Sequence, residues 1–184
     1  MDQMMDEGEK AQEATEETRI KGTKPSHKLE AYAGEYEHPA YGLLRIEYED
    51  GTLRSEYNGL PATLEHWHYD VFRANMEELG DQKMLVRFRT NEKGDIHEVL
   101  APLEPTVSEI VFTRIPDRRL RDPEFLKLLT GTYELATQTV RFEIRGDSTL
   151  VLILPGQPVY TLEPYQGTTF TLNGLTGFSV QFVG

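Results

Sequence analysis

The sequence predicts an all-β protein built from short antiparallel strands, arranged as two related units of which the second is the shorter. Three observations support this prediction: segments in which apolar and polar residues alternate, turn dipeptides such as Asp50-Gly51 between them, and an internal repeat. About eight short strands can be placed in the roughly 85 residues after Glu30, and no long helical pattern interrupts them. This regular spacing is typical of an antiparallel barrel or sandwich.

Residues 1–28 differ in composition from the rest and are predicted to form an acidic leader. The first 24 residues carry many charges and contain no Trp, Phe or Tyr. Their Glu, Ala, Lys and Gln residues favour a helix, but no continuous apolar face is present. We expect a short helical or disordered linker, with an oligomerising helix as the alternative.

Residues 29–116 are predicted to form the first β unit. Residues 44–48 and 53–57 alternate in polarity on either side of Asp50-Gly51, which is a strong hairpin signal. Further strands are expected at 85–88, 96–100 and 110–113. Large side chains at alternating positions would fill the interior of a small barrel and leave little room for a ligand. These side chains are Tyr36, Ile46, Tyr48, Leu53, Tyr57, Phe72 and Phe88.

Residues 117–184 are predicted to form the second unit, which opens with a short helix. Asp122 is placed to cap this helix, Pro123 suits its first turn, and Gly131 follows its apolar residues. After Gly131 the sequence repeats the first unit, because residues 34–37 (GEYE) match residues 131–134 (GTYE) at an offset of 97.

The second copy is predicted to be incomplete. Residues 59–61 (GLP) match residues 156–158 (GQP) at the same offset, but residues 95–113, which form the last hairpin of the first copy, have no counterpart. A barrel that lacks two strands has open edges, and such edges pair with other chains. We therefore expect the second unit either to be marginally stable or to be completed by a neighbour.

Composition excludes several classes of function. The net charge is −12 with a pI near 4.9, and no basic stripe is present, so nucleic-acid binding is not expected. No run of apolar residues is long enough to span a membrane, and no secretion signal precedes the first unit. Cysteine is absent, which excludes disulfides and thiol catalysis. The cellular compartment stays undecided.

The segment 65–70 (EHWHYD) is the strongest candidate for a binding site. On a regular strand, His66, His68 and Asp70 would share one face, and two histidines with a carboxylate can ligate zinc. The alternative is that these side chains form a solvated surface face. We expect this alternative, and therefore expect neither a bound metal nor a cofactor. Trp67 would then lie in the core or at the barrel mouth. If a ligand binds, we expect it at His66, Trp67 and His68.

Tyr41 is a second candidate ligand-binding residue. It follows His38-Pro39, which should be extended, and begins a predicted strand. The position suits either a ligand-binding rim at the barrel mouth or simply the turn after the first strand.

Catalytic motifs are absent from the sequence. It contains no Ser-x-x-Lys, no Lys-Thr-Gly, no Gly-x-Ser-x-Gly and no glycine-rich phosphate loop. The five serines lie in unrelated contexts. We therefore do not expect the chain to be an enzyme.

Two stretches of the first unit resemble a known domain. Residues 29–53 (LEAYAGEYEHPAYGLLRIEYEDGTL) and 59–72 (GLPATLEHWHYDVF) resemble a lipocalin-like domain C-terminal to the catalytic unit of β-lactamase-related, penicillin-binding-protein-like serine hydrolases. Residues 119–135 and 154–172 resemble the second barrel-like segment of some members. The resemblance implies an eight-stranded barrel followed by a truncated barrel-like repeat.

The resemblance also implies a function without catalysis. It suggests a bacterial accessory or assembly module, a C-terminal fragment or split gene product of a serine hydrolase whose family is often exported. No catalytic residue is carried over, because the nucleophile motif is missing. Partners would be the hydrolase catalytic domain or a second copy, through the open strand edges. The alternative is a lipocalin-like domain that binds a small molecule.

Overall fold

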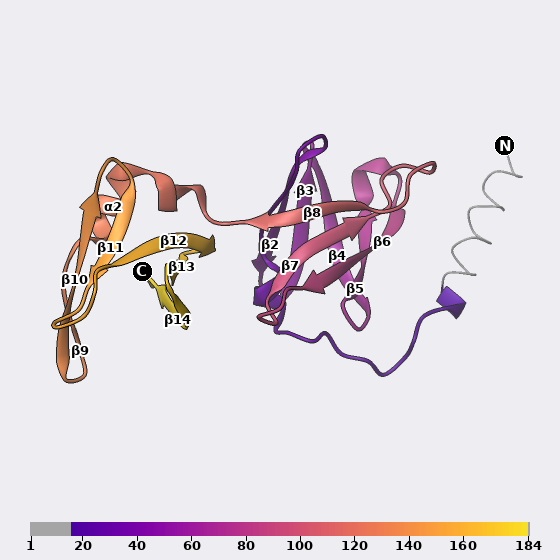
Figure 1. The fold of residues 1–184 in the computed structure, drawn as a ribbon. Coiled ribbons are helices and arrows are strands. Elements are labelled where there is room, and N and C mark those ends of the chain that lie inside the picture. The colour runs from indigo at the N-terminus through magenta and orange to yellow at the C-terminus, as the bar shows by residue number, and fades with distance from the viewer. Residues whose placement is uncertain (1–15, 184) are drawn as a thin grey trace, which may run out of the picture. The chain divides into compact units, whose positions relative to one another are not determined.

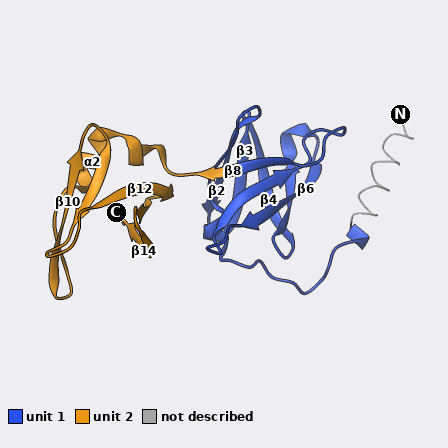
Figure 2. Cartoon of the chain, in the orientation of Figure 1, with its two compact units in different colours: residues 1–113 blue, residues 114–184 orange. Residues whose placement is uncertain are grey.

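The computed structural model describes residues 16–183, which form two compact units, one ending at Thr113 and the other beginning at Arg114 (Figures 1 and 2). The all-β prediction is confirmed: the first unit is a closed eight-stranded barrel and the second is a six-stranded sheet with a short helix. Much of the predicted leader, residues 1–15, lies outside the described residues. No helix within the described residues is long and apolar enough to cross a membrane.

Each strand of the barrel pairs antiparallel with the next strand in the sequence (Figure 1). A 3-10 turn, η1 (Leu29–Tyr32), precedes the first strand, and a second one, η2 (Glu77–Leu79), joins β5 to β6. Closure into a barrel pairs the backbone groups of every strand and leaves no open edge. The strands are β1 (Gly34–His38), β2 (Gly42–Glu49), β3 (Thr52–Tyr57), β4 (Leu60–His68), β5 (Val71–Met76), β6 (Gln82–Thr90), β7 (Ile96–Ala101) and β8 (Ile110–Ile115).

Two-residue turns fix the register of the first hairpins. Asp50 and Gly51 join β2 to β3 with φ angles of 49° and 81°. Asn58 and Gly59 join β3 to β4 with φ angles of 50° and 78°. Two successive left-handed residues are what a type I′ turn requires, and this turn matches the twist of the flanking strands. The Asp-Gly prediction is therefore confirmed, and Asn58-Gly59 forms the same kind of turn.

The barrel core is aromatic at one end. Tyr32 from η1 is completely buried against Phe72 and Phe88, with ring centroids 5.0 and 4.9 Å away. Phe72 and Phe88 are 5.4 Å apart and meet edge to face, which is a favourable geometry for aromatic rings. The side chain of Tyr32 therefore plugs this end of the barrel.

The second unit is a meander covered by a short helix. Its elements are η3 (Arg118–Arg121), α2 (Pro123–Leu129), β9 (Gly131–Leu135), β10 (Gln138–Arg145), β11 (Thr149–Ile153), β12 (Tyr160–Gln166), β13 (Thr169–Leu172) and β14 (Leu175–Gln181). The predicted cap is present, since the Asp122 carboxylate accepts a hydrogen bond from the Glu124 amide at 3.1 Å. Leu120 and Leu126 are buried in one cluster with Val140 and Phe142 of the sheet.

The internal repeat is visible in the order of the strands. The six strands β9 to β14 follow one another as β1 to β6 do, and the described residues of the second unit contain no counterpart of β7 and β8. The prediction of a second, shorter repeat is confirmed. Within the described residues, β9 and β14 each have a single neighbouring strand, so they are the edges of this sheet.

The burial of Phe72 predicts how much the free energy of unfolding falls when its ring is removed. Phe72 is 1% exposed, so we expect Phe72→Ala to lower the free energy of unfolding of the first unit by about 3–5 kcal/mol. Urea denaturation followed by Trp67 fluorescence measures this, because Trp67 is the single tryptophan of the chain and lies in the first unit. Leu79→Ala, at a side chain that is 41% exposed, is the control and should change stability by no more than about 0.5 kcal/mol. Equal stability of the two variants would contradict this account of the core.

Candidate binding site in the barrel

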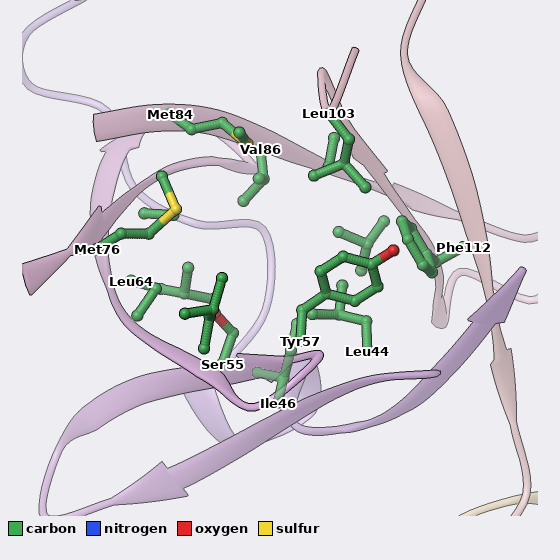
Figure 3. Close-up of a pocket in the computed structure, with 15 residues that line it drawn as sticks. Leu44, Ile46, Ser55, Tyr57, Leu64, Met76, Met84, Val86, Leu103 and Phe112 are labelled. Carbon is green, nitrogen blue, oxygen red and sulfur yellow. The ribbon is translucent and has the colours of Figure 1, made fainter. Parts of the chain in front are cut away.

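The barrel interior is only partly filled. A cavity of about 90 Å³ lies away from the aromatic plug, toward the end where β3 joins β4 and β5 joins β6 (Figure 3). Apolar side chains of strands β2 to β8 form almost all of its wall. The expectation that large side chains fill the barrel therefore holds at the Tyr32 end for Phe72 and Phe88 and fails at the opposite end. The reason is that small residues, Ala62, Ala74 and Ala101, occupy inward positions there. The expectation is also wrong for Tyr48, which is 38% exposed and lies outside the core.

Flexible side chains line the mouth of the cavity. Met76 ends β5 and Met84 lies near the start of β6, and Figure 3 shows them together on one side with Leu103 across from them. All three are half-buried, and Leu60 beside them is 38% exposed. Methionine adapts its shape easily, which suits the entrance of a site. The sequence analysis missed these residues, and their position at strand ends is the signal that could have identified them.

Two hydroxyl groups interrupt the apolar wall, those of Ser55 and Tyr57. The Tyr57 hydroxyl donates a hydrogen bond to the Tyr41 carbonyl oxygen at 2.8 Å. The Tyr41 hydroxyl in turn donates to the Glu104 carboxylate at 2.6 Å, and this bond raises the pKa of Tyr41 above its usual value. Tyr41, a predicted ligand-binding residue, thus lies at the cavity end of the barrel and ties the β1–β2 connection to the loop after β7.

The connections at the cavity end are acidic. They comprise residues 39–41, 58–59, 77–81 and 102–109, which contain no Lys or Arg. Their carboxylates are those of Glu77, Glu78, Asp81, Glu104 and Glu109. Glu109 is paired with Arg87 on β6 at 2.7 Å. The other carboxylates give the mouth a negative potential, which favours cationic over anionic ligands.

The other predicted site residues lie at the opposite end of the barrel. A bulge in β4 pairs His66 with Phe72 and His68 with Val71, and Asp70 lies in the turn beyond the strand. The regular alternation that would place the three side chains on one face is therefore broken. No group of three His, Asp or Glu side chains within residues 16–183 is arranged to hold a metal ion. The structure does not bring Tyr41 together with these residues either.

Trp67 lies on the outside of the barrel, yet it is only 1% exposed. Its indole ring is placed between two guanidinium groups, those of Arg19 and Arg73, each 5.0 Å from the ring centroid. Arg19 also donates hydrogen bonds to the carbonyl oxygens of Trp67 and His66, at 2.9 and 3.0 Å. Arg73 is paired with Glu16 and with Glu65. Cation–π contacts and hydrogen bonds thus cover the ring, and Trp67 is a packing residue in this conformation.

Residues 16–28, here named the strap, run along the β4–β5 hairpin. The Ile20 amide donates to His68 Nδ1 at 3.1 Å, and the Tyr69 amide donates to Thr23 Oγ1 at 3.0 Å. Sequence reasoning placed these residues in the leader, because the strap has no periodicity of its own. Its contacts with the hairpin are long-range hydrogen bonds, an ion pair and a cation–π contact, which leave no local signal.

Asp70 joins the strap to the aromatic plug. Its Oδ1 accepts hydrogen bonds from the Tyr32 hydroxyl and from the amide and hydroxyl of Ser26. Burial, together with the bond to Asp70, raises the pKa of Tyr32 to about 12. Burial alone would raise the pKa of Asp70, but the hydrogen bonds from Tyr32 and Ser26 outweigh it and hold the pKa below 3.8.

The contact between the Arg19 guanidinium and the Trp67 ring can be tested by substitution. Removing the Arg19 side chain should expose the indole ring and cost about 0.5–2 kcal/mol of stability. We expect Arg19→Ala to shift the fluorescence of the folded protein to longer wavelength and to increase its quenching by acrylamide. Lys21→Ala, which removes an equal charge from an exposed position of the strap, should leave both unchanged. A spectrum of Arg19→Ala identical to that of the wild type would show that the strap does not cover Trp67.

The hydrogen bonds of Asp70 predict a pH-dependent stability. Because the folded protein holds the pKa of Asp70 below the unfolded value of 3.8, the stabilisation is complete above that value and is lost as the pH falls through the lower folded pKa. Asp70→Asn should therefore be destabilised most near neutral pH, and the difference from the wild type should shrink below about pH 4. Urea denaturation across a pH series measures this difference in the free energy of unfolding. Asp50→Asn is the control, because Asn suits a type I′ turn equally well; a difference for Asp70→Asn that does not change with pH would contradict the prediction.

A comparison with protein families places the barrel and most of the strap in one unit. The model of a family described as a domain of unknown function, DUF3471, matches residues 18–114. This segment begins within the strap and ends inside β8. No curated protein and no solved structure matches the chain. Since the matched segment spans more than half of the 184 residues, the chain belongs to the DUF3471 family.

Proposed function

We propose that the chain is a non-catalytic accessory or assembly module of a β-lactamase-related serine hydrolase. In this role it docks to a hydrolase catalytic domain or to a second copy of itself. The resemblance of both units, in order, to the segments that follow such catalytic domains supports the proposal. Membership of the DUF3471 family agrees with the assignment of the first unit to a recurring domain.

The edges of the six-stranded sheet are the observation that carries this proposal. Every residue of β9 is exposed, and so are most residues of β14. Large apolar side chains project from both edges: Leu135 is 56% exposed and Phe178 is 62% exposed. Unpaired backbone groups beside exposed apolar side chains are the features through which a sheet adds a strand from another chain.

The module has no chemistry of its own in this proposal. Its hydroxyl, imidazole and carboxylate groups at the strap end are engaged in structural hydrogen bonds, as Asp70 is with Tyr32 and Ser26. The sequence offers no nucleophile motif. Turnover of a chromogenic ester or β-lactam by the purified chain, above a heat-denatured control, would contradict this part of the proposal.

A second candidate function is the binding of a small molecule inside the barrel. The cavity of about 90 Å³ favours it, because a closed eight-stranded barrel can hold a small ligand where side chains leave space. Its apolar wall with two hydroxyl groups has the composition of a ligand pocket.

The assembly proposal is tested by the association state of the full chain. We expect sedimentation velocity to show oligomers whose fraction grows with concentration. Phe178→Lys should shift the distribution toward the monomer, because a charge on the exposed edge opposes pairing. Val107→Lys places the same charge on an apolar side chain of the first unit that is 46% exposed, and should leave the distribution unchanged.

Docking to a hydrolase is tested in the same experiment. The catalytic domain of a β-lactamase-related hydrolase from the same organism is added, and co-sedimentation with the chain is measured. A chain that stays monomeric at every concentration and does not co-sediment with that domain would contradict the proposal.

A further inference from the structure

We propose that the barrel cavity binds a small cationic amphiphile, with a short aliphatic chain inside the barrel and an ammonium head at its mouth. This inference rests on the second candidate function, ligand binding in the barrel, and names the chemical class of the ligand. Three features of the cavity carry it: its volume, the absence of charge on its wall, and the carboxylates around its entrance.

The volume limits the buried part of the ligand. An apolar cavity of about 150 Å³ in a protein core holds benzene, which has six carbon atoms. A cavity of about 90 Å³ scales to roughly four carbon atoms. The cavity therefore fits the end of an aliphatic chain and not a fused ring system.

The wall determines where the polar part of the ligand lies. None of the residues that line the cavity is charged, so an ionised head group inside it would lose its hydration without a partner. The Tyr57 hydroxyl is directed to the Tyr41 carbonyl oxygen. An ionised head must therefore remain at the mouth, beside Met76, Met84 and Leu103.

The carboxylates at the entrance determine the sign of the charge that the ligand's head group should carry. Glu77 and Glu78 directly follow Met76, and Glu104 directly follows Leu103, so carboxylates flank the residues at the mouth. Asp81 lies in the same connection as Glu77, and a single basic residue, Lys83 on β6, directly precedes Met84, so carboxylates outnumber basic groups beside the mouth residues. An ammonium head is attracted by this surplus of negative charge and a carboxylate head is repelled. Fatty-acid-like ligands are thus disfavoured.

Methionine methyl NMR of the full chain provides the test, because Met76 and Met84 report directly on the mouth of the cavity. The probes are pentylammonium chloride, 1-pentanol and sodium pentanoate at neutral pH. We expect pentylammonium to shift both methyl resonances with a dissociation constant on the order of millimolar, since only about four methylene-sized groups are buried. Pentanoate should bind at least about threefold more weakly at low salt, and the difference should shrink as salt is added.

Chain length provides an independent check on the volume. Affinity should rise from propylammonium to about pentylammonium and then level off, because further carbon atoms lie outside the cavity. Affinity that keeps rising through decylammonium would overturn the proposed size limit.

Matched variants separate the role of charge from the role of space. Glu77→Gln/Glu78→Gln should remove most of the preference for pentylammonium over pentanoate. Glu49→Gln/Glu92→Gln removes two exposed carboxylates at the opposite end of the barrel. This control variant should keep the preference for pentylammonium over pentanoate. Ala62→Leu should fill the cavity and abolish the shifts with all three probes. The Gln variants carry changes on exposed side chains alone, so they remain informative if Ala62→Leu does not fold.

The outcomes distinguish this inference from the function on which it rests. If no probe shifts Met76 or Met84, ligand binding in the barrel is overturned together with the inference. If pentanol or pentanoate binds as tightly as pentylammonium, ligand binding stands and the assignment of a cationic ligand is overturned.

Discussion

The need to pair the backbone groups of every strand is the constraint on which the rest of the structure depends. The first unit meets it by closing eight antiparallel strands on themselves. A closed barrel of this size has an interior just wide enough for its own side chains. Whether space remains is then decided by the residues at inward positions: Tyr32, Phe72 and Phe88 fill one end, and small residues such as Ala62 and Ala101 leave a cavity at the other.

The two ends of the barrel therefore differ in packing and in charge. At one end the strap is held against the β4–β5 hairpin by the Asp70 carboxylate and by the Arg19 guanidinium, which covers Trp67. The strap holds more basic than acidic residues and the barrel holds more acidic than basic ones, so overall attraction adds to these specific charge-assisted hydrogen bonds. At the other end the connections carry five carboxylates and no Lys or Arg, and the cavity opens there. The cavity proposed to bind a ligand thus lies at the end of the barrel opposite the strap.

The second unit meets the same constraint only in part. Its six strands repeat the order of β1 to β6, and its helix α2 precedes β9 as η1 precedes β1. The edges β9 and β14 keep unpaired backbone groups next to exposed Leu135 and Phe178. A sheet with such edges gains stability when another strand pairs with it. The chain thus combines a closed barrel that retains a cavity with a sheet that has two open edges.

The sequence by itself determined the features that arise from contacts between near neighbours. The Asp50-Gly51 turn, the Asp122 cap and the alternating strands were predictable because each depends on the conformation of two to six residues. The repeat also required only the sequence. The tertiary structure decided the site: the β4 bulge separated His66 from His68 and Asp70, and barrel closure placed Tyr41 and Met76 at one end and Trp67 at the other. Such placements depend on strand pairing and long-range packing across the whole barrel, which no local pattern encodes.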